Sequence, residues 1–96
     1  MKIRVKVKFF TALREIVGKK EEQIEFSKPV TVEELLRHLS QRHGKRFKEY
    51  VYDEKGEVHS HLHFLINGQS TTTLQGFKTK LKEGDQVAIL PPVGGG

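Results

Sequence analysis

The chain has 96 residues, a length that fits one domain with a single modest hydrophobic core. Lysine and arginine total 17 against 12 aspartates and glutamates, and the formal net charge of +5 favours acidic partners without requiring them. The absence of cysteine excludes disulfide scaffolds, cysteine-ligated zinc and side-chain thiol chemistry. No stretch approaches the roughly 18–20 apolar residues that span a bilayer, and the charged N-terminus lacks a signal-peptide core. We therefore expect a cytoplasmic protein that does not insert into membranes.

The first half of the chain predicts two strands and two helices. Residues 3–9 alternate strictly between apolar and cationic side chains, which indicates a strand with one apolar and one cationic face. Helical spacing of apolar residues over 10–17 predicts a short helix, residues 19–22 resemble a polar connection, and 23–26 predict a second strand. Thr31 and Glu34 fit a capping box at the start of the main helix, whose apolar stripe runs from Val32 to Leu39 and which we expect to end at Gly44.

The second half predicts a hairpin and a final strand. Residues 45–61 show no clear pattern beyond a short turn or helix at 47–51. Alternation returns over 62–66, and Asn67-Gly68 is the strongest signal for a type I′ turn in the chain, with a return arm over 69–73. Apolar residues at 74, 77 and 81 are irregular anchors, a turn follows at 83–85, and residues 87–90 form the last predicted strand. This order indicates an α+β domain over residues 1–91, in which the main helix covers one face of a mixed sheet.

The last residues, 92–96, are predicted to form a flexible tail. Pro91 and Pro92 end the final strand, because proline has no N–H to continue the hydrogen-bond ladder. After Val93, the three glycines at 94–96 have no side chain, so the backbone fits a narrow channel in another protein. We therefore expect the terminal carboxylate of Gly96 to be the reacting group, with Gly94 and Gly95 as its tether. The alternative is that the glycines are a frayed end or a cloning remnant.

Two leucines are candidates for a partner-binding surface. If Phe64 and Ile66 face the core, the pleat turns Leu65 to the opposite face, and Leu90 is turned outward in the same way beside Ile89. The alternative is that single exposed leucines are ordinary features of a protein surface.

Histidines at 59, 61 and 63 show the only metal-like spacing in the chain. They have no carboxylate at a suitable position to complete a zinc site, so we expect no metal there. His38 and His43 fall on the main helix, where we expect them to face solvent or to pair with the helix dipole. No phosphate-binding loop and no nucleophile with a matching base stands out, so we expect no intrinsic catalytic site and no enzyme activity of its own.

Taken in order, four segments resemble the ubiquitin-like β-grasp family, namely Lys8–Glu15, Val32–Leu39, Phe64–Gly68 and Gly84–Val93. With the terminal glycines, they are most similar to its sulfur-carrier branch: the small subunit of molybdopterin synthase, the thiamine sulfur carrier and the small archaeal modifier proteins. One departure is Gly94, where many relatives carry another small residue. The resemblance implies that the first and last strands lie parallel at the centre of the sheet, so that the tail leaves one end of the domain.

The resemblance also implies partners and chemistry. A ubiquitin-activating type of adenylating enzyme would bind the domain through residues such as Leu65, Leu90 and the strip Pro91–Val93, and would form an acyl-adenylate on Gly96. ATP and magnesium would be held by that enzyme, and no cofactor by this chain. Attack by a persulfide then leaves a thiocarboxylate, whereas attack by a lysine amine leaves an isopeptide bond.

These branches give three functional hypotheses. We favour a sulfur carrier of the molybdopterin synthase small-subunit type, which acts with the large subunit of that synthase. The second hypothesis is a protein modifier that is conjugated to lysines of target proteins through the same glycine. The third and least favoured is a basic nucleic-acid-binding module, motivated by the +5 charge and the cationic first strand.

Overall fold

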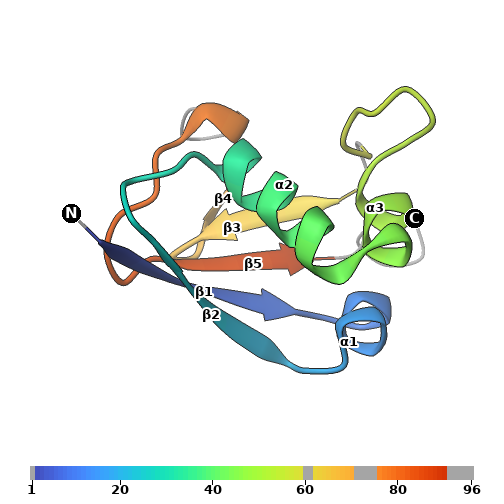
Figure 1. Cartoon of the computed structure of the whole chain (residues 1–96), viewed down its shortest axis with the longest axis horizontal. Coiled ribbons are helices and arrows are strands. Elements are labelled where there is room, and N and C mark those ends of the chain that lie inside the picture. The colour runs from blue at the N-terminus through green and yellow to red at the C-terminus, as the bar shows by residue number, and fades with distance from the viewer. Residues whose placement is uncertain (1, 60–61, 71–75, 91–96) are drawn as a thin grey trace.

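The computed structural model describes residues 2–59, 62–70 and 76–90, and over these ranges the chain has the predicted α+β architecture. A mixed sheet of five strands, in the order β2-β1-β5-β3-β4, carries the helices on one side (Figure 1). The strands are β1 (Ile3–Phe9), β2 (Glu21–Phe26), β3 (His63–Ile66), β4 (Gln69–Ser70) and β5 (Gln86–Leu90). The helices are α1 (Ala12–Val17), α2 (Val32–His43), α3 (Lys45–Val51) and the 3-10 helix η2 (Gly76–Lys78).

The first and last strands lie side by side at the centre of the sheet. β1 pairs with β5 in parallel, with Val7 opposite Val87 and Phe9 opposite Ile89. β2 and β3 flank this pair as antiparallel neighbours. The arrangement implied by the resemblance is therefore confirmed. Because β1 and β5 run in the same direction, both end at the edge of the sheet where α1 begins (Figure 1).

The core lies between the sheet and α2. Every apolar residue of the alternating first strand is buried, and the α2 side chains of the predicted stripe have no exposed surface. Burial of each such leucine, isoleucine or valine stabilises the fold by roughly 1.5–3 kcal/mol relative to an exposed position. The core residues contributed by these two elements are Ile3, Val5, Val7, Phe9, Val32, Leu35, Leu36 and Leu39.

Both ends of α2 are formed as the sequence predicts. At its start the Glu34 backbone N–H donates to the Thr31 hydroxyl at 3.2 Å, and the Thr31 N–H donates to the Glu34 carboxylate at 2.8 Å, which is a capping box. At its end the Gly44 N–H donates to the Ser40 carbonyl at 2.9 Å. Gly44 has a φ of 86°, a value that favours glycine and explains why the helix stops there.

The Asn67-Gly68 turn joins β3 to β4 as expected. Both residues have positive φ, 52° and 85°, as a type I′ turn requires. The Asn67 side chain also holds the start of β5, because its amide donates to Asp85 at 2.9 Å and its carbonyl accepts the Gln86 N–H at 3.0 Å. The part of the predicted return arm beyond Ser70, and the predicted anchor Leu74, lie outside the described residues.

The structure corrects the sequence interpretation at the starts of α1 and β2. The first helix begins at Ala12, so Phe10 precedes it and is half-buried outside the main core. β2 begins at Glu21, within the segment that was expected to be a polar connection. The short turn or helix expected at 47–51 is confirmed as the helix α3, which begins at Lys45 and buries Phe47 and Val51 fully.

Candidate functional site

The candidate site lies on the outer face of the sheet, near the end of β5. Leu65 is in register with Ala88, and Leu90 is in register with His63, so these side chains point away from the core. Leu65, Ala88 and Leu90 are half-buried and do not belong to the core, and we call these three residues the outer patch. The predicted outward orientation of Leu65 and Leu90 is confirmed. Ala88, the residue between them, was missed, although alternation with Val87 and Ile89 predicts its orientation.

Phe10 lies at the same end of the sheet as the outer patch. Phe9 of β1 is paired with Ile89 of β5. Phe10 and Leu90 are the residues that come directly after this pair. The Phe10 side chain is half-buried but does not pack on the core. An aromatic residue here adds apolar surface at the point where the parallel strands end.

Acidic residues partly neutralise the cationic face of β1. Lys6 forms an ion pair with Glu21 at 3.3 Å, and the Arg4 guanidinium forms one with Glu83 at 3.3 Å. The Arg4 backbone N–H also donates to the Glu83 carboxylate, which holds the pKa of Glu83 below its ordinary value. Exposed pairs of this kind contribute little to stability, because solvent screens them. They reduce the free positive charge on which a nucleic-acid-binding surface would depend.

A buried carboxylate, Glu22, supports the same end of the sheet from inside. Its side chain is 3% exposed and accepts hydrogen bonds from Arg42 at 2.6 Å and from Lys19 at 3.3 Å. The Nε2 atom of His43 is hydrogen-bonded to the same carboxylate at 2.8 Å. The His43 ring also packs edge-on against Phe9, with 6.1 Å between ring centroids. The cluster therefore connects β2, the last turn of α2 and the end of β1.

Charge and burial act in opposite directions on Glu22. Burial raises the pKa of this carboxyl, whereas the hydrogen bonds from His43, Arg42 and Lys19 lower it, and the net pKa is below the ordinary value. Glu22 thus stays ionised inside the fold. The sequence analysis missed this residue because a glutamate is expected on the surface. Glu22 is two residues before Ile24 on the same strand, and this spacing places both side chains on the buried face.

The structure modifies the expectations for the histidines. The His43 side chain is 12% exposed and bonded to Glu22, so the solvent-facing alternative is wrong for this residue. His38 is half-buried with its ring edge against Phe26, at 5.2 Å between centroids. His61 lies outside the described residues, and within the described ranges no group of three or more His, Cys, Asp or Glu side chains could hold a metal ion.

The tail that carries the predicted chemistry, Pro91–Gly96, lies outside the described residues. Its roles therefore remain predictions from the sequence. The structure supplies its point of departure, because the described part of the chain ends at Leu90, which belongs to the outer patch. Among the described helices, none has the length and apolar character needed to cross a bilayer.

Comparison with known proteins identifies the family. The sequence model of the ThiS family matches residues 7–96. The chain belongs to the ThiS family. Small archaeal modifier protein 3 of Haloferax volcanii is 34% identical over 94 residues, which is 98% of this chain and 100% of that protein.

Two solved structures extend the comparison. A Pyrococcus furiosus protein, provisionally named molybdopterin converting factor, subunit 1, is 34% identical, with a TM-score of 0.76 over 95% of this chain and 99% of its own. A chain in the Amycolatopsis orientalis BexX/CysO complex is 29% identical, with a TM-score of 0.74 over 96% of this chain and 99% of its own. The resemblance to ubiquitin-like sulfur carriers and the β-grasp fold is thereby confirmed. This ThiS-family chain is a small ubiquitin-like protein of the carrier and modifier class.

Proposed function

We propose that this protein is a sulfur carrier in which the carboxyl group of Gly96 carries the sulfur. The observation that carries the proposal is the match to the ThiS family, which runs through residue 96 and so includes the glycine tail. The position of the outer patch beside the end of β5 supports it, because a partner bound there would meet the tail as it leaves the domain.

The chemistry starts with activation of the carboxylate. A carboxylate is a poor electrophile at neutral pH, so its oxygen first attacks the α-phosphorus of ATP and releases pyrophosphate, which gives an acyl-adenylate. A persulfide then attacks the acyl carbon and releases AMP. A thiol reduces the resulting acyl disulfide, which leaves the thiocarboxylate on Gly96 and a disulfide on the sulfur donor. Since this chain has no cysteine, the persulfide and the thiol belong to partner proteins.

The partners in this proposal are enzymes that hold ATP and magnesium and bind the domain by its outer patch. Leu65 and Leu90 supply apolar anchors, and Pro91, Pro92 and Val93 lead the tail into the partner's active site. A structural relative that is seen in a complex with another protein, BexX, supports partner binding in general. The similarity to a molybdopterin converting factor supports the large subunit of molybdopterin synthase as the acceptor of the sulfur.

Protein modification is the second candidate function. It is favoured by the 34% identity to small archaeal modifier protein 3, which covers the whole of that protein. The same acyl-adenylate would be attacked by a lysine ε-amine, with release of AMP and formation of an isopeptide bond to Gly96. The two functions share the activation step and differ in the nucleophile.

The activation step can be tested by deleting Gly95 and Gly96. The assay contains a ubiquitin-activating type of enzyme from the same host, ATP and magnesium. We expect the enzyme to release pyrophosphate from ATP when the intact chain is present and to release none with the deletion variant. The variant still ends in a carboxylate, on Gly94, but this group is two residues closer to the domain. The test therefore asks whether the carboxylate must be at position 96. The thermal unfolding midpoint of the two proteins should agree, because the core residues of the described ranges all lie between Ile3 and Ile89. Equal pyrophosphate release from both would contradict the proposal.

A further inference from the structure

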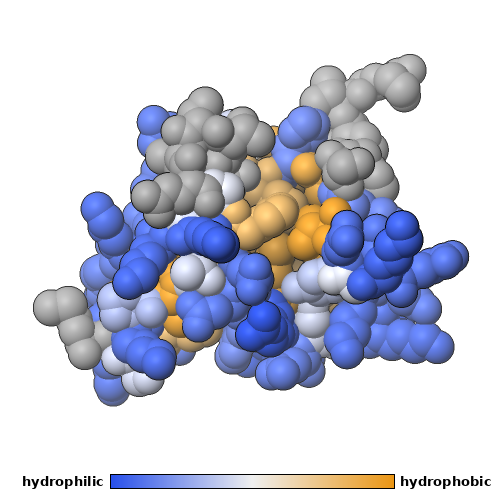
Figure 2. Space-filling view, turned by 90° about the horizontal axis from the view of Figure 1, so that it is seen from above, coloured by the Kyte–Doolittle hydropathy of each residue, from blue (hydrophilic) through white to orange (hydrophobic). Residues whose placement is uncertain are grey.

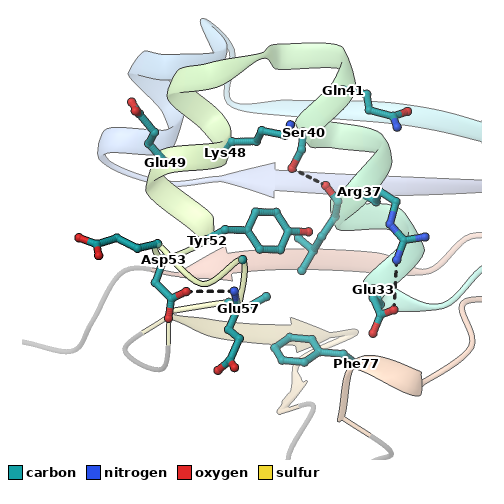
Figure 3. Close-up of a pocket in the computed structure, with 14 residues that line it drawn as sticks. Glu33, Arg37, Ser40, Gln41, Lys48, Glu49, Tyr52, Asp53, Glu57 and Phe77 are labelled. Atoms are coloured by element: carbon teal, nitrogen blue, oxygen red, sulfur yellow. Dashed lines mark hydrogen bonds and ion pairs between the residues drawn. The ribbon is translucent and has the colours of Figure 1, made fainter.

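A groove on the helical side of the molecule is not used by the proposed function. It has a volume of about 890 Å³ and lies between α2 on one side and the end of α3 with the following turn on the other (Figure 3). Phe77 of η2 closes a third side. The α2 wall is made by Glu33, Leu36, Arg37, Ser40 and Gln41.

The floor of the groove is apolar. Tyr52, Val58 and Phe77 are each half-buried, and they line the groove together with the fully buried Leu36. The Phe77 ring packs edge-on against Phe64 at 5.3 Å between centroids, which fixes it over the core. Figure 2, which looks down on the side where η2 and the 53–58 turn lie, shows apolar surface that the surrounding hydrophilic side chains leave uncovered.

The rim of the groove is acidic, although the chain as a whole is basic. Five carboxylates line it against two cations, Arg37 and Lys48, whereas the whole chain has a net charge of +5. Arg37 is already paired with Glu33 at 3.3 Å. The acidic residues of the rim are Glu33, Glu49, Asp53, Glu54 and Glu57.

Three of these carboxylates remain available to a partner. Asp53 is occupied, because its carboxylate accepts the backbone N–H groups of Lys55 and Glu57 at 2.8 and 3.0 Å. Glu49, Glu54 and Glu57 are exposed, and their carboxylates form no ion pair with any residue in the described part of the chain. Their charge is complementary to a cationic ligand.

The α2 wall has the spacing of a helix-packing surface. Its lining residues recur at intervals of three and four over two turns, which is roughly 12 Å of helix. Ser40 lies in the middle of this stretch, and its hydroxyl donates back to the Leu36 carbonyl at 2.9 Å. Ser40 is itself buried and hydrogen-bonded with the Tyr52 side chain. A second helix would therefore pack over Tyr52 and along the exposed α2 positions Glu33, Arg37 and Gln41.

We propose that this groove binds an amphipathic helix of a partner protein, with its apolar side chains on the floor and its lysines or arginines along the acidic rim. The groove is lined by the helical layer, whereas the outer patch lies on the face of the sheet turned away from that layer. The protein can therefore hold such a helix while an activating enzyme occupies the patch. The second site would bring the activated carrier to an acceptor that displays this helix.

A designed peptide tests the proposal. The probe is a fluorescent peptide of about 15 residues, long enough to form a helix on binding, with leucines on one face and lysines on the other. In NMR spectra of the labelled protein, we expect the amide signals of Arg37, Ser40 and Tyr52 to shift and those of Leu65 and Ala88 to stay in place. Shifts confined to the outer patch, or no binding at all, would overturn the proposal.

Charge-reversal variants separate the groove from general electrostatics. We expect E54K/E57K to weaken peptide binding about tenfold, which corresponds to roughly 1.4 kcal/mol. The control E15K/E25K makes the same change in net charge at exposed positions outside the groove and should leave the affinity within about twofold. An equal loss in both variants contradicts the proposal, because it would mean that only the overall charge matters.

Two further comparisons complete the test. A peptide of the same composition with a central proline cannot form a continuous helix, and we expect it to bind at least tenfold more weakly. Equal binding of this peptide would overturn the assignment of a helical ligand. Deletion of Gly95 and Gly96 should leave peptide binding unchanged while it abolishes adenylation, so failure of the proposed function and failure of this inference give different results.

Discussion

At the scale of a single residue, Glu22 contributes to the acid stability of the molecule. Its pKa lies below the ordinary value because the hydrogen bonds from His43, Arg42 and Lys19 outweigh the opposing effect of burial. The unfolded chain therefore binds a proton at Glu22 at a higher pH than the folded protein does. The resulting stabilisation is fully present above the unfolded pKa and is lost as the pH falls through the lower, folded pKa.

Replacement of Glu22 by glutamine should expose this dependence. We expect Glu22→Gln to lower the free energy of unfolding by about 1.5–3 kcal/mol near pH 7, because three hydrogen bonds lose their charged acceptor. The difference from wild type should shrink as the pH is lowered to about 3 in urea unfolding experiments. Glu25→Gln is the matched control, since Glu25 is exposed on the same strand. A loss of stability that does not change with pH would show that the carboxylate charge is not the cause.

Leu65 provides a residue-scale test of partner binding. We expect Leu65→Ser to weaken binding of the activating enzyme about tenfold, because a central apolar anchor of an interface typically contributes more than 1 kcal/mol. Its effect on folding should be small, since the side chain is half-buried and outside the core. Calorimetric titration measures the affinity. Gln23→Ser, an exposed change on the same outer face two strands from β5, is the control; equal effects of both variants would count against the outer patch.

At the scale of elements, the sequence predicts those parts whose local signals agree with their tertiary surroundings. β1 has strict alternation, α2 has a capping box and a single apolar stripe, and the Asn67-Gly68 turn has its residue signature. α3 has a weaker signal, the apolar residues over 47–51, which left a turn and a helix both open; its packing against α1 and α2 places Phe47 and Val51 in the core. The start of β2 was misjudged because a buried position is occupied by an acid whose partners, Arg42 and His43, lie some twenty residues away.

The cap of α2 can be tested as an element. We expect Thr31→Ala to destabilise the protein by about 1 kcal/mol in urea unfolding, because the Glu34 N–H loses its acceptor at the helix start. Thr11→Ala is a matched control at the start of α1. The Thr11 hydroxyl donates to the Phe10 carbonyl and caps no helix N–H, so a smaller loss is expected there. A loss at Thr11 as large as that at Thr31 would contradict the capping account.

At the scale of the whole molecule, the fold separates a helical face, an outer sheet face and an exit point for the chain. The orientation of Leu65 and Leu90 could be predicted because alternation is a local property. The groove could not be predicted, because its lining residues are spread over the sequence from Glu33 to Phe77 and come together only in the folded chain. The role assigned to Gly96 depends on the sequence and the family match, which together place a glycine tail after the strand beside the outer patch.

The most direct test of this account is intact-mass spectrometry of the protein purified from its native host. Sulfur carriage predicts a population whose mass is increased by replacement of one oxygen with sulfur, localised to Gly96 by fragmentation. That population should disappear when the activating enzyme is deleted from the host. Recovery of the protein solely with an unmodified carboxylate, or solely in branched peptides linked to lysines, would contradict the account.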